Sequence, residues 1–221
     1  MRFNFLAAAF STLLFISLVL TSCKKQEPAT ITIAGTITET NGTAISGADI
    51  KMSVKEISGG TFSSTFNTFY NGPSASNGSY SHTFDAHNAV EYKIEITGDN
   101  RFDQEFIINP DDLERNAANT YDFSLIAQAW YKVNIRNTSP FDSTDFMQYQ
   151  IASTQLNCPG CCHNLIQVFS GDLVDSTFKC MTTGNSMLKV NWYVTKNSIP
   201  SSYSDSVYCA IGDTGILNVN Y

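Results

Sequence analysis

The sequence predicts an all-β protein built of two antiparallel β-sandwich domains. Apolar and polar residues alternate in run after run beyond residue 31, and short turns rich in Gly and Asn separate the runs. Apolar residues at helical spacing are nearly absent after the first 22 residues. Many short, half-buried strands joined by close turns are typical of antiparallel sandwiches.

Residues 1–22 have the layout of a secretory signal peptide. Arg2 precedes an apolar run that extends to about Leu20, and the small residues Thr21 and Ser22 follow. A charged start, an apolar centre and small residues at the cleavage site mark such signals. The run is marginal as a membrane span, because a span needs about 20 predominantly apolar residues and hydroxyl side chains interrupt this one.

The stretch Leu20-Thr21-Ser22-Cys23 resembles the bacterial lipobox, in which signal peptidase cuts before a cysteine that carries a diacylglyceryl group. The resemblance implies that Cys23 is the lipidated first residue of a lipoprotein and that residues 23–30 form a short tether. The alternative is an ordinary signal peptide with an incidental cysteine. Each buried lipid methylene contributes about 0.8 kcal/mol, so such an anchor would hold the chain at a membrane. Lys24 stands where inner-membrane retention signals carry Asp, which favours the outer membrane, at its periplasmic face or at the cell surface.

The strands are expected where the alternation is clearest. The alternating runs occupy, in chain order, residues 49–55, 92–96, 131–135, 188–194 and 217–221. One short helical segment is expected in "NPDDLERNAAN", where Asp111 or Asp112 would cap it.

The first alternating block resembles the carboxypeptidase-regulatory-like, transthyretin-like domains. The resemblance covers about residues 31–126 and depends on turn glycines, a small-Gly-Ala step before the second strand and a Gly-x-Tyr strand start; the matching residues are Gly35, Gly42, Gly47, Ala48, Gly78 and Tyr80. It implies a β-sandwich accessory module, residues 31–127, without catalytic residues of its own. The aromatic stretch "GGTFSSTFNTFYNGPSA" departs from the family pattern by its length.

A second alternating block, residues 128–221, resembles no family and holds every cysteine except Cys23. Its 94 residues suffice for one small sandwich with a cysteine cluster. One continuous domain of about 190 residues is the alternative that all-β chains also form.

The residues offer little support for an enzyme. The histidines are His82, His87 and His163, and the sequence lacks a Gly-x-Ser-x-Gly elbow, a phosphate-binding loop and a His-Glu-x-x-His motif. The formal charge is −7, and it becomes −8 when the removal of residues 1–22 takes Arg2 away, which argues against nucleic-acid binding. We therefore expect neither catalysis nor a cofactor.

The stretch "NCPGCCHN", residues 157–164, contains three cysteines and a histidine. An exported domain tends to oxidise its thiols, so disulfides are the favoured interpretation; the candidates are Cys158, Cys161, Cys162, Cys180 and Cys209. Five cysteines allow 5 × 3 = 15 ways to form two bridges and leave one thiol. We predict a Cys180–Cys209 bridge between strands, with Cys158 joined to Cys161 or Cys162.

The alternative for the same cluster is a metal, haem or redox site. Its ligands would be drawn from Cys158, Cys161, Cys162, His163 and Cys180. Haem attachment requires Cys-x-x-Cys-His, and here an extra cysteine displaces the histidine by one position.

Together these observations predict a non-enzymatic lipoprotein held at a membrane by its N-terminal lipid. Its expected role is binding, adhesion or scaffolding in the cell envelope, with a polysaccharide, a peptide or an envelope protein as partner. A metal-binding or redox lipoprotein centred on the cysteine cluster is the alternative.

The lipobox leads to the first testable prediction. Cells that produce the chain and grow with labelled palmitate should attach label to the wild type and none to Cys23→Ala, because the acyl chains are built on that cysteine. Equal labelling of both proteins, or of neither, would contradict the lipoprotein assignment.

Overall fold

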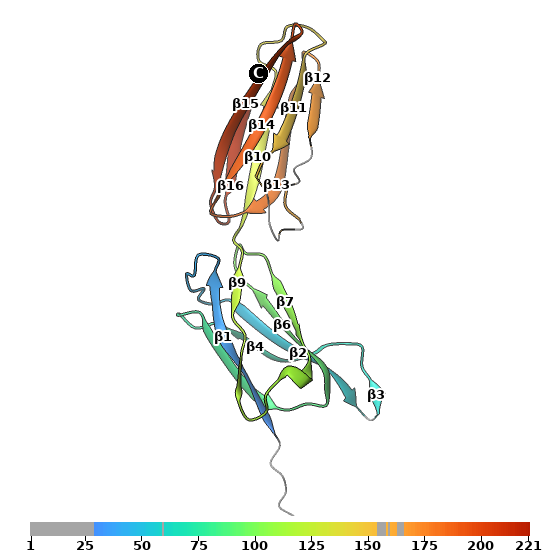
Figure 1. The fold of residues 1–221 in the computed structure, drawn as a ribbon, viewed down its shortest axis with the longest axis vertical. Helices are drawn as coiled ribbons and strands as arrows, with labels where there is room; N and C mark the ends of the chain where they lie inside the picture. Colours follow the sequence, from blue (N-terminus) through green and yellow to red (C-terminus); the bar gives the residue numbers. More distant parts are fainter. Residues whose placement is uncertain (1–28, 59, 154–157, 159, 163–165) are drawn as a thin grey trace, which may run out of the picture.

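The computed structural model of the protein describes residues 29–58, 60–153, 158, 160–162 and 166–221. These residues form β-strands and one short 3-10 helix, which confirms the predicted all-β sandwich fold (Figure 1). None of the described residues belongs to a helix with the length and apolar character needed to cross a membrane. The proposed lipid site, Cys23, lies outside the described residues.

The strands fall into two groups, which we call the N-terminal lobe (β1–β9) and the C-terminal lobe (β10–β16) (Figure 1). The elements of the N-terminal lobe are, in chain order, β1 (Thr30–Glu39), β2 (Asp49–Ser58), β3 (Thr61–Phe62), β4 (Asn67–Pro73), β5 (Ser79–Asp85), β6 (Ala89–Thr97), β7 (Gln104–Ile108), η1 (Pro110–Asp112), β8 (Ala118–Thr120) and β9 (Phe123–Leu125). Those of the C-terminal lobe are β10 (Gln128–Arg136), β11 (Phe146–Ile151), β12 (Gln167–Ser170), β13 (Asp175–Thr183), β14 (Ser186–Lys196), β15 (Ile199–Cys209) and β16 (Thr214–Asn220).

The N-terminal lobe is a sandwich of two sheets. In one sheet β1 lies between β5 and the pair β8 and β9, and in the other the order is β3-β2-β6-β7, with β4 also paired to β2. Alternate residues of the central strands, such as Ile33, Ile50 and Ile94, are fully buried in one cluster between the sheets. The alternation seen in the sequence is therefore the division between core and solvent faces.

The C-terminal lobe is a second sandwich with its own buried cluster. Its sheets have the orders β13-β10-β16 and β12-β11-β14-β15. Tyr131 of β10 and Tyr149 of β11 meet in the middle of this core, and their hydroxyl groups share a hydrogen bond. Both are almost completely buried, and burial raises the pKa of each phenol well above its ordinary value.

Some pairings depart from the antiparallel expectation. β8 and β9 run parallel to β1, and β16 runs parallel to β10. In each case a long stretch of chain, with other strands in it, separates the two partners, as a parallel connection requires. Alternation within one strand is the same for both directions, so the sequence did not distinguish them.

The expected helical segment is only the single turn η1, and its predicted cap was wrong. The side chain of Asn109, one residue before the helix, accepts a hydrogen bond from the N–H of Asp111 at 3.1 Å. Asp111 and Asp112 lie inside the turn instead of capping it. Pro110 occupies the first position, where the missing N–H has no cost.

Gly35 and Tyr80 both pack closely against the carbonyl group of Tyr121. A Cβ atom on Gly35 would lie 1.8 Å from the carbonyl oxygen of Tyr121, so only glycine fits there. The buried ring of Tyr80 lies beside Gly35, and its hydroxyl donates to the same carbonyl at 2.7 Å. The tyrosine of the Gly-x-Tyr motif, Tyr80, is therefore a core residue.

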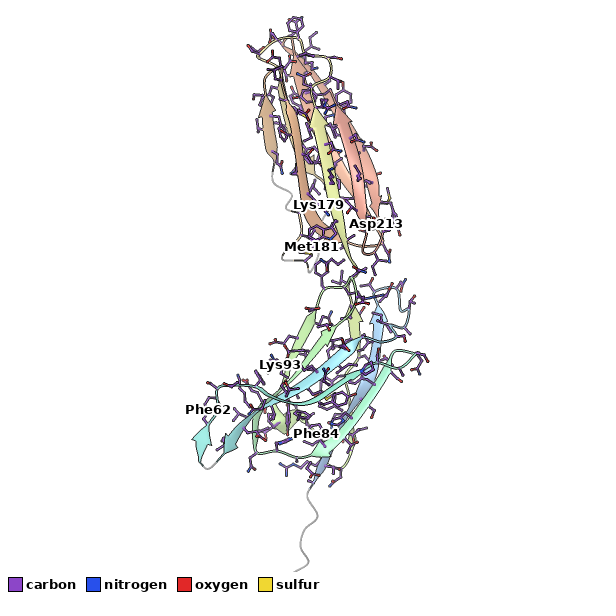
Figure 2. The ribbon with its side chains drawn as sticks, turned by 180° about the vertical axis from the view of Figure 1, so that it is seen from behind. Phe62, Phe84, Lys93, Lys179, Met181 and Asp213 are labelled. Carbon is purple, nitrogen blue, oxygen red and sulfur yellow. A yellow bond between two sulfur atoms is a disulfide. The ribbon has the colours of Figure 1, made fainter. Side chains whose placement is uncertain are left out.

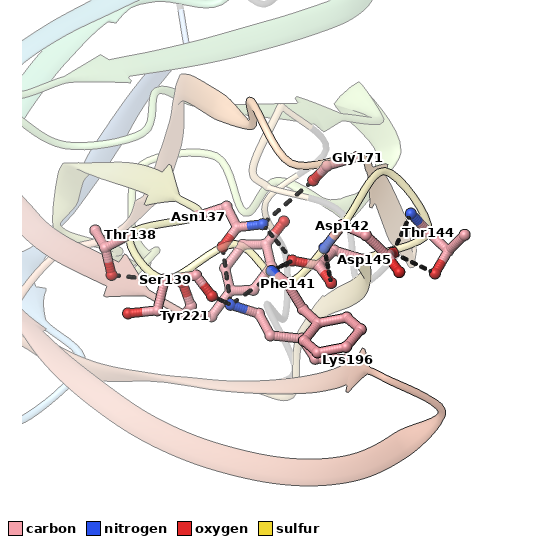
Figure 3. Close-up of polar contacts among 10 residues, drawn as sticks. All are labelled: Asn137, Thr138, Ser139, Phe141, Asp142, Thr144, Asp145, Gly171, Lys196 and Tyr221. Carbon is pink, nitrogen blue, oxygen red and sulfur yellow. Dashed lines mark hydrogen bonds and ion pairs between the residues drawn. The ribbon is translucent and has the colours of Figure 1, made fainter.

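A buried carboxylate organises the far end of the C-terminal lobe (Figure 3). Asp145 is fully buried and accepts hydrogen bonds from Asn137 at 2.8 Å and from the N–H of Phe141 at 2.9 Å. Lys196 lies 3.9 Å away and donates to Asn137 at 2.8 Å. Burial raises the pKa of Asp145, but these hydrogen bonds and Lys196 outweigh it and hold the pKa below its usual range. The network therefore stabilises the fold at neutral pH and loses that contribution as the pH falls through the folded-state pKa.

The two lobes lie end to end (Figure 1), and Ala127 and Gln128 join β9 of one lobe to β10 of the other through hydrogen bonds to both lobes. The N–H of Gln128 donates to Asn100 of the N-terminal lobe at 2.7 Å, and its carbonyl accepts from Gly212 of the C-terminal lobe at 2.8 Å. The carbonyl of Ala127 accepts from Gly184 at 2.7 Å. Backbone hydrogen bonds thus hold the junction from both sides.

Tyr80 gives a stability prediction. Tyr80→Ala should lower the free energy of unfolding by about 3 kcal/mol, because it removes a buried aromatic ring. Tyr80→Phe should cost about 1 kcal/mol, because it keeps the ring and removes only the bond to the Tyr121 carbonyl. Urea unfolding of the full chain measures both values. An unchanged stability of Tyr80→Ala would remove Tyr80 from the core.

Candidate functional site

The cysteine cluster forms two neighbouring disulfides at the end of the C-terminal lobe that faces the N-terminal lobe. Cys158 is bonded to Cys161, with 5.3 Å between their Cα atoms, and Cys162 is bonded to Cys180, with 5.4 Å. The N–H of Cys162 donates at 2.8 Å to the carbonyl of Met181 of β13, which is labelled in Figure 2, so Cys162 lies beside this strand. The Cys162–Cys180 disulfide fastens the connection between β11 and β12 to the other sheet, and the Cys158–Cys161 disulfide closes a loop within that connection.

The predicted Cys180–Cys209 bridge was wrong. Cys180 pairs with Tyr131 in one sheet, whereas Cys209 pairs with Ser186 in the other. Stacked sheets lie about 10 Å apart, and a disulfide requires Cα atoms closer than about 7 Å. Cys162 reaches Cys180 because it lies at the edge of the sandwich beside β13.

Among the described cysteines, Cys209 alone keeps a free thiol. It is fully buried, and a Cβ atom on Gly215 would lie 2.7 Å from its sulfur. Burial raises the pKa of this thiol, and the contact with the Gly215 backbone offsets that only in part. A buried thiol with a raised pKa is chemically inert, so Cys209 acts as a core residue.

The metal alternative loses most of its ligands in this arrangement. Zinc binds cysteine as thiolate, and the sulfurs of Cys158, Cys161, Cys162 and Cys180 are consumed in disulfides. The remaining candidate ligand, His163, lies outside the described residues. Within the described part of the chain, no three His, Cys, Asp or Glu side chains are grouped to hold a metal ion.

The two described histidines lie in an aromatic cluster of the N-terminal lobe. The ring of His82 stacks on Tyr70 with 4.1 Å between centroids, and burial lowers its pKa. The Nδ1 atom of His87 lies 2.5 Å from a carboxylate oxygen of Glu56, and its ring packs on Phe69. Aromatic rings and a carboxylate therefore account for the contacts of both side chains.

A polar groove lies on the outer face of the β12-β11-β14-β15 sheet, and we call it the amide groove. Its volume is about 470 Å³. Its lining residues are Gln148, Tyr149, Gln150, Ile166, Asn191, Trp192, Tyr193, Ser202, Tyr203 and Ser204. A second hollow of about 510 Å³ shares Asn191 and Ser204 with the amide groove and continues along β14 and β15 past Lys189 and Ser206.

Strand register arranges the outward side chains of the amide groove in two rows across the sheet. Gln148, Tyr193 and Ser202 are directly paired across β11, β14 and β15. Two residues further along each strand, Gln150, Asn191 and Ser204 form the second row. The intervening residues, such as Tyr149 and Val190, point into the core.

The outward polar side chains of the amide groove are largely unpaired. Within the described part of the chain, five of them have no hydrogen-bond partner: Gln148, Asn191, Tyr193, Ser202 and Ser204. Among the described residues, nothing competes with a ligand for their donors and acceptors.

The outer face of the opposite sheet, β13-β10-β16, is different. The amide of Asn134 donates to Asn218 at 2.7 Å and accepts from Thr177 at 2.9 Å. Arg136 forms an ion pair with Asp175 at 2.8 Å. These five side chains are paired with one another, whereas five outward side chains of the amide groove have no partner among the described residues.

A further hollow of about 780 Å³ lies between β7 and β9 at the edge of the N-terminal lobe. The rings of Phe106, Tyr121 and Phe123 pack along it, with 5.5 Å between the first two. Some of its polar side chains are already paired: Asp122 accepts from Thr36, and Gln104 donates across the gap to Ser124 at 2.7 Å. Unlike the amide groove, this hollow is lined by carboxylates, those of Asp103, Glu105 and Asp122.

The residues of the amide groove form no known motif, but their alternation is visible in the sequence. In "FMQYQI" the amides Gln148 and Gln150 alternate with buried residues, and in "VNWY" and "SSYS" polar groups take the same alternate positions. Only the pairing of the three strands shows that these positions share one face.

Neither a family model nor a curated protein matches the chain. The resemblance to carboxypeptidase-regulatory-like domains stays a sequence-based prediction. Solved structures with similarity include the Bacillus anthracis TIE protein, with 7% identity and a TM-score of 0.39 over 87% of this chain and 34% of that one. A streptococcal ancillary pilin has 11% identity and a TM-score of 0.34 over 89% of this chain and 63% of that one. A DUF3823 family protein from Bacteroides uniformis has 10% identity and a TM-score of 0.29 over 81% and 99%.

This chain therefore spans about a third of the first of these structures and less than two thirds of the second. Identities and TM-scores this low assign neither a family nor a function.

The disulfides give a prediction that separates the observed pairing from the one expected from the sequence. Proteolysis without reductant should release a peptide that links Cys162 to Cys180, and reduction should destabilise the protein. An 18-residue loop contributes about 3 kcal/mol. Cys180→Ala should remove most of the difference between the oxidised and reduced melting temperatures, whereas the control Cys209→Ala should keep it. A Cys180–Cys209 peptide would contradict the structure.

Proposed function

We propose that the chain is a non-enzymatic lipoprotein of the cell envelope that binds a ligand in the amide groove. The observation that carries this proposal is the contrast between the two outer faces of the C-terminal lobe. On one face five polar side chains bond to one another, and on the other five have no hydrogen-bond partner among the described residues and surround a groove. Surface polar groups that are free and converge on one hollow are typical of binding sites.

The arrangement of the lobes supports a role in presenting the groove away from a membrane. The chain enters the N-terminal lobe at the end opposite to the C-terminal lobe (Figure 1). A lipid on Cys23, joined by the tether of residues 23–30, would anchor that end. The N-terminal lobe then acts as a spacer, and the amide groove lies in the lobe farther from the anchor.

The disulfides support the same role. Cys162 is fastened to β13, and Ile166, which lines the amide groove, follows it by four residues. Disulfides persist in oxidising compartments such as the periplasm and the cell exterior, in agreement with export.

Retention on envelope material tests the proposal. Purified full chain mixed with the insoluble envelope fraction of the producing cells should sediment with it. Ser204→Arg should remain in the supernatant, because the long charged side chain fills the groove from the edge strand β15. The matched control is Ile216→Arg, an exposed position of β16 on the opposite outer face, and it should sediment like the wild type.

Melting temperatures close to that of the wild type verify that both variants fold. Equal sedimentation of the wild type, Ser204→Arg and Ile216→Arg would show that the amide groove does not bind the envelope ligand. Absence of all three from the pellet would refute the binding role itself.

A further inference from the structure

The polar groups of the amide groove are uncharged. Carboxamides and hydroxyls supply them, and no Asp, Glu, Lys or Arg is among the described residues that line the 470 Å³ hollow. Lys189 and Asp205 enter only in the continuing hollow. An ionic ligand would lose hydration in the amide groove without an opposite charge to replace it. The chemistry therefore selects a ligand that is polar and neutral.

The groups of the amide groove both donate and accept hydrogen bonds. A carboxamide such as that of Gln148 or Asn191 carries two N–H donors and a carbonyl acceptor, and the hydroxyl of Ser202 or Ser204 does both. A ligand hydroxyl has the same dual character. Side chains of this kind, placed in two paired rows, match a surface that carries many hydroxyl groups.

An extended peptide fits this face less well. A peptide that joins a sheet does so through the unpaired backbone of an edge strand. In the amide groove the backbones of β11 and β14 are paired on both sides, to β12, to each other and to β15. Across β11 and β14, therefore, only side chains face the ligand.

Tyr193 supplies an aromatic surface within the same row as Gln148 and Ser202. Its side chain is 38% exposed, and its ring packs against no other ring among the described residues. The face of an aromatic ring carries partial negative charge and attracts weakly positive C–H groups. A sugar ring presents C–H groups on its face and hydroxyls at its edge, which matches a tyrosine flanked by an amide and a serine.

We propose that the amide groove binds a neutral polysaccharide, with one sugar ring on Tyr193 and the hydroxyls of its neighbours on Gln148, Asn191 and Ser204. A polymer fits better than a single sugar because the amide groove continues into the second hollow of about 510 Å³ along β14 and β15. Successive rows lie two residues apart, about 6.6 Å along the strands, so several rows contact successive parts of one chain. This inference rests on the proposed binding role and names the class of its ligand.

Affinity electrophoresis of the full chain in native gels tests it. The probes are dextran, mannan and xylan, which are neutral, with polygalacturonate as the anionic control. At least one neutral polysaccharide should retard the wild type, and added salt should leave the dissociation constant unchanged, because no charges pair.

Three variants assign the binding to the groove. Tyr193→Ala should raise the dissociation constant about tenfold, the equivalent of one aromatic contact. Tyr193→Phe keeps the ring and should retain most of the affinity. Trp130→Ala removes a partly exposed aromatic side chain from the opposite outer face and should bind like the wild type.

Three results would overturn the inference: no retardation by any neutral polysaccharide, retardation by polygalacturonate alone with loss in salt, or equal affinity of Tyr193→Ala and the wild type. Failure here is distinguishable from failure of the proposed function. If Ser204→Arg still abolishes retention on the envelope fraction while neutral polysaccharides do not bind, the binding role stands and the ligand class is wrong.

Discussion

The hydrogen bond between the hydroxyls of Tyr131 and Tyr149 is the constraint on which the C-terminal lobe depends. The two rings come from facing sheets, are almost completely buried and meet in the centre of the core. Their raised pKa values keep both phenols neutral. A buried hydroxyl without a partner costs about 1–3 kcal/mol, so β10 and β11 must hold the alignment in which the two meet.

That alignment decides which side chains reach the solvent. Because the side-chain period of a strand is two, placing Tyr149 inside places Gln148 and Gln150 outside, and a slip of one residue would bury both amides. The pairing of β11 with β14 then puts Asn191 and Tyr193 beside them. The contact between Tyr131 and Tyr149 in the core thus fixes which side chains form the amide groove on the outer face. The Cys162–Cys180 disulfide fastens the loop that follows β11 to the opposite sheet.

Local patterns in the sequence were enough to predict the strands, because alternation and turn residues act over a few positions. These local patterns could not predict which strands pair, in which direction they run or in what register. The parallel pairing of β16 with β10 leaves no trace in the alternation of either strand. The disulfide partner of Cys180 depends on which sheet holds Cys209. The amide groove needed the register of three strands, so Gln148 and Asn191 carried no visible signal when taken separately.

The most direct measurement of the central claim follows side-chain amide resonances of the full chain by NMR during titration with each neutral polysaccharide of the panel. The account predicts that the amide signals of Gln148, Gln150 and Asn191 shift with saturation, while those of Asn134 and Asn218 on the self-paired face stay in place. Shifts of Asn134 and Asn218 without shifts of the groove amides, or no shift of any of the five, would contradict it.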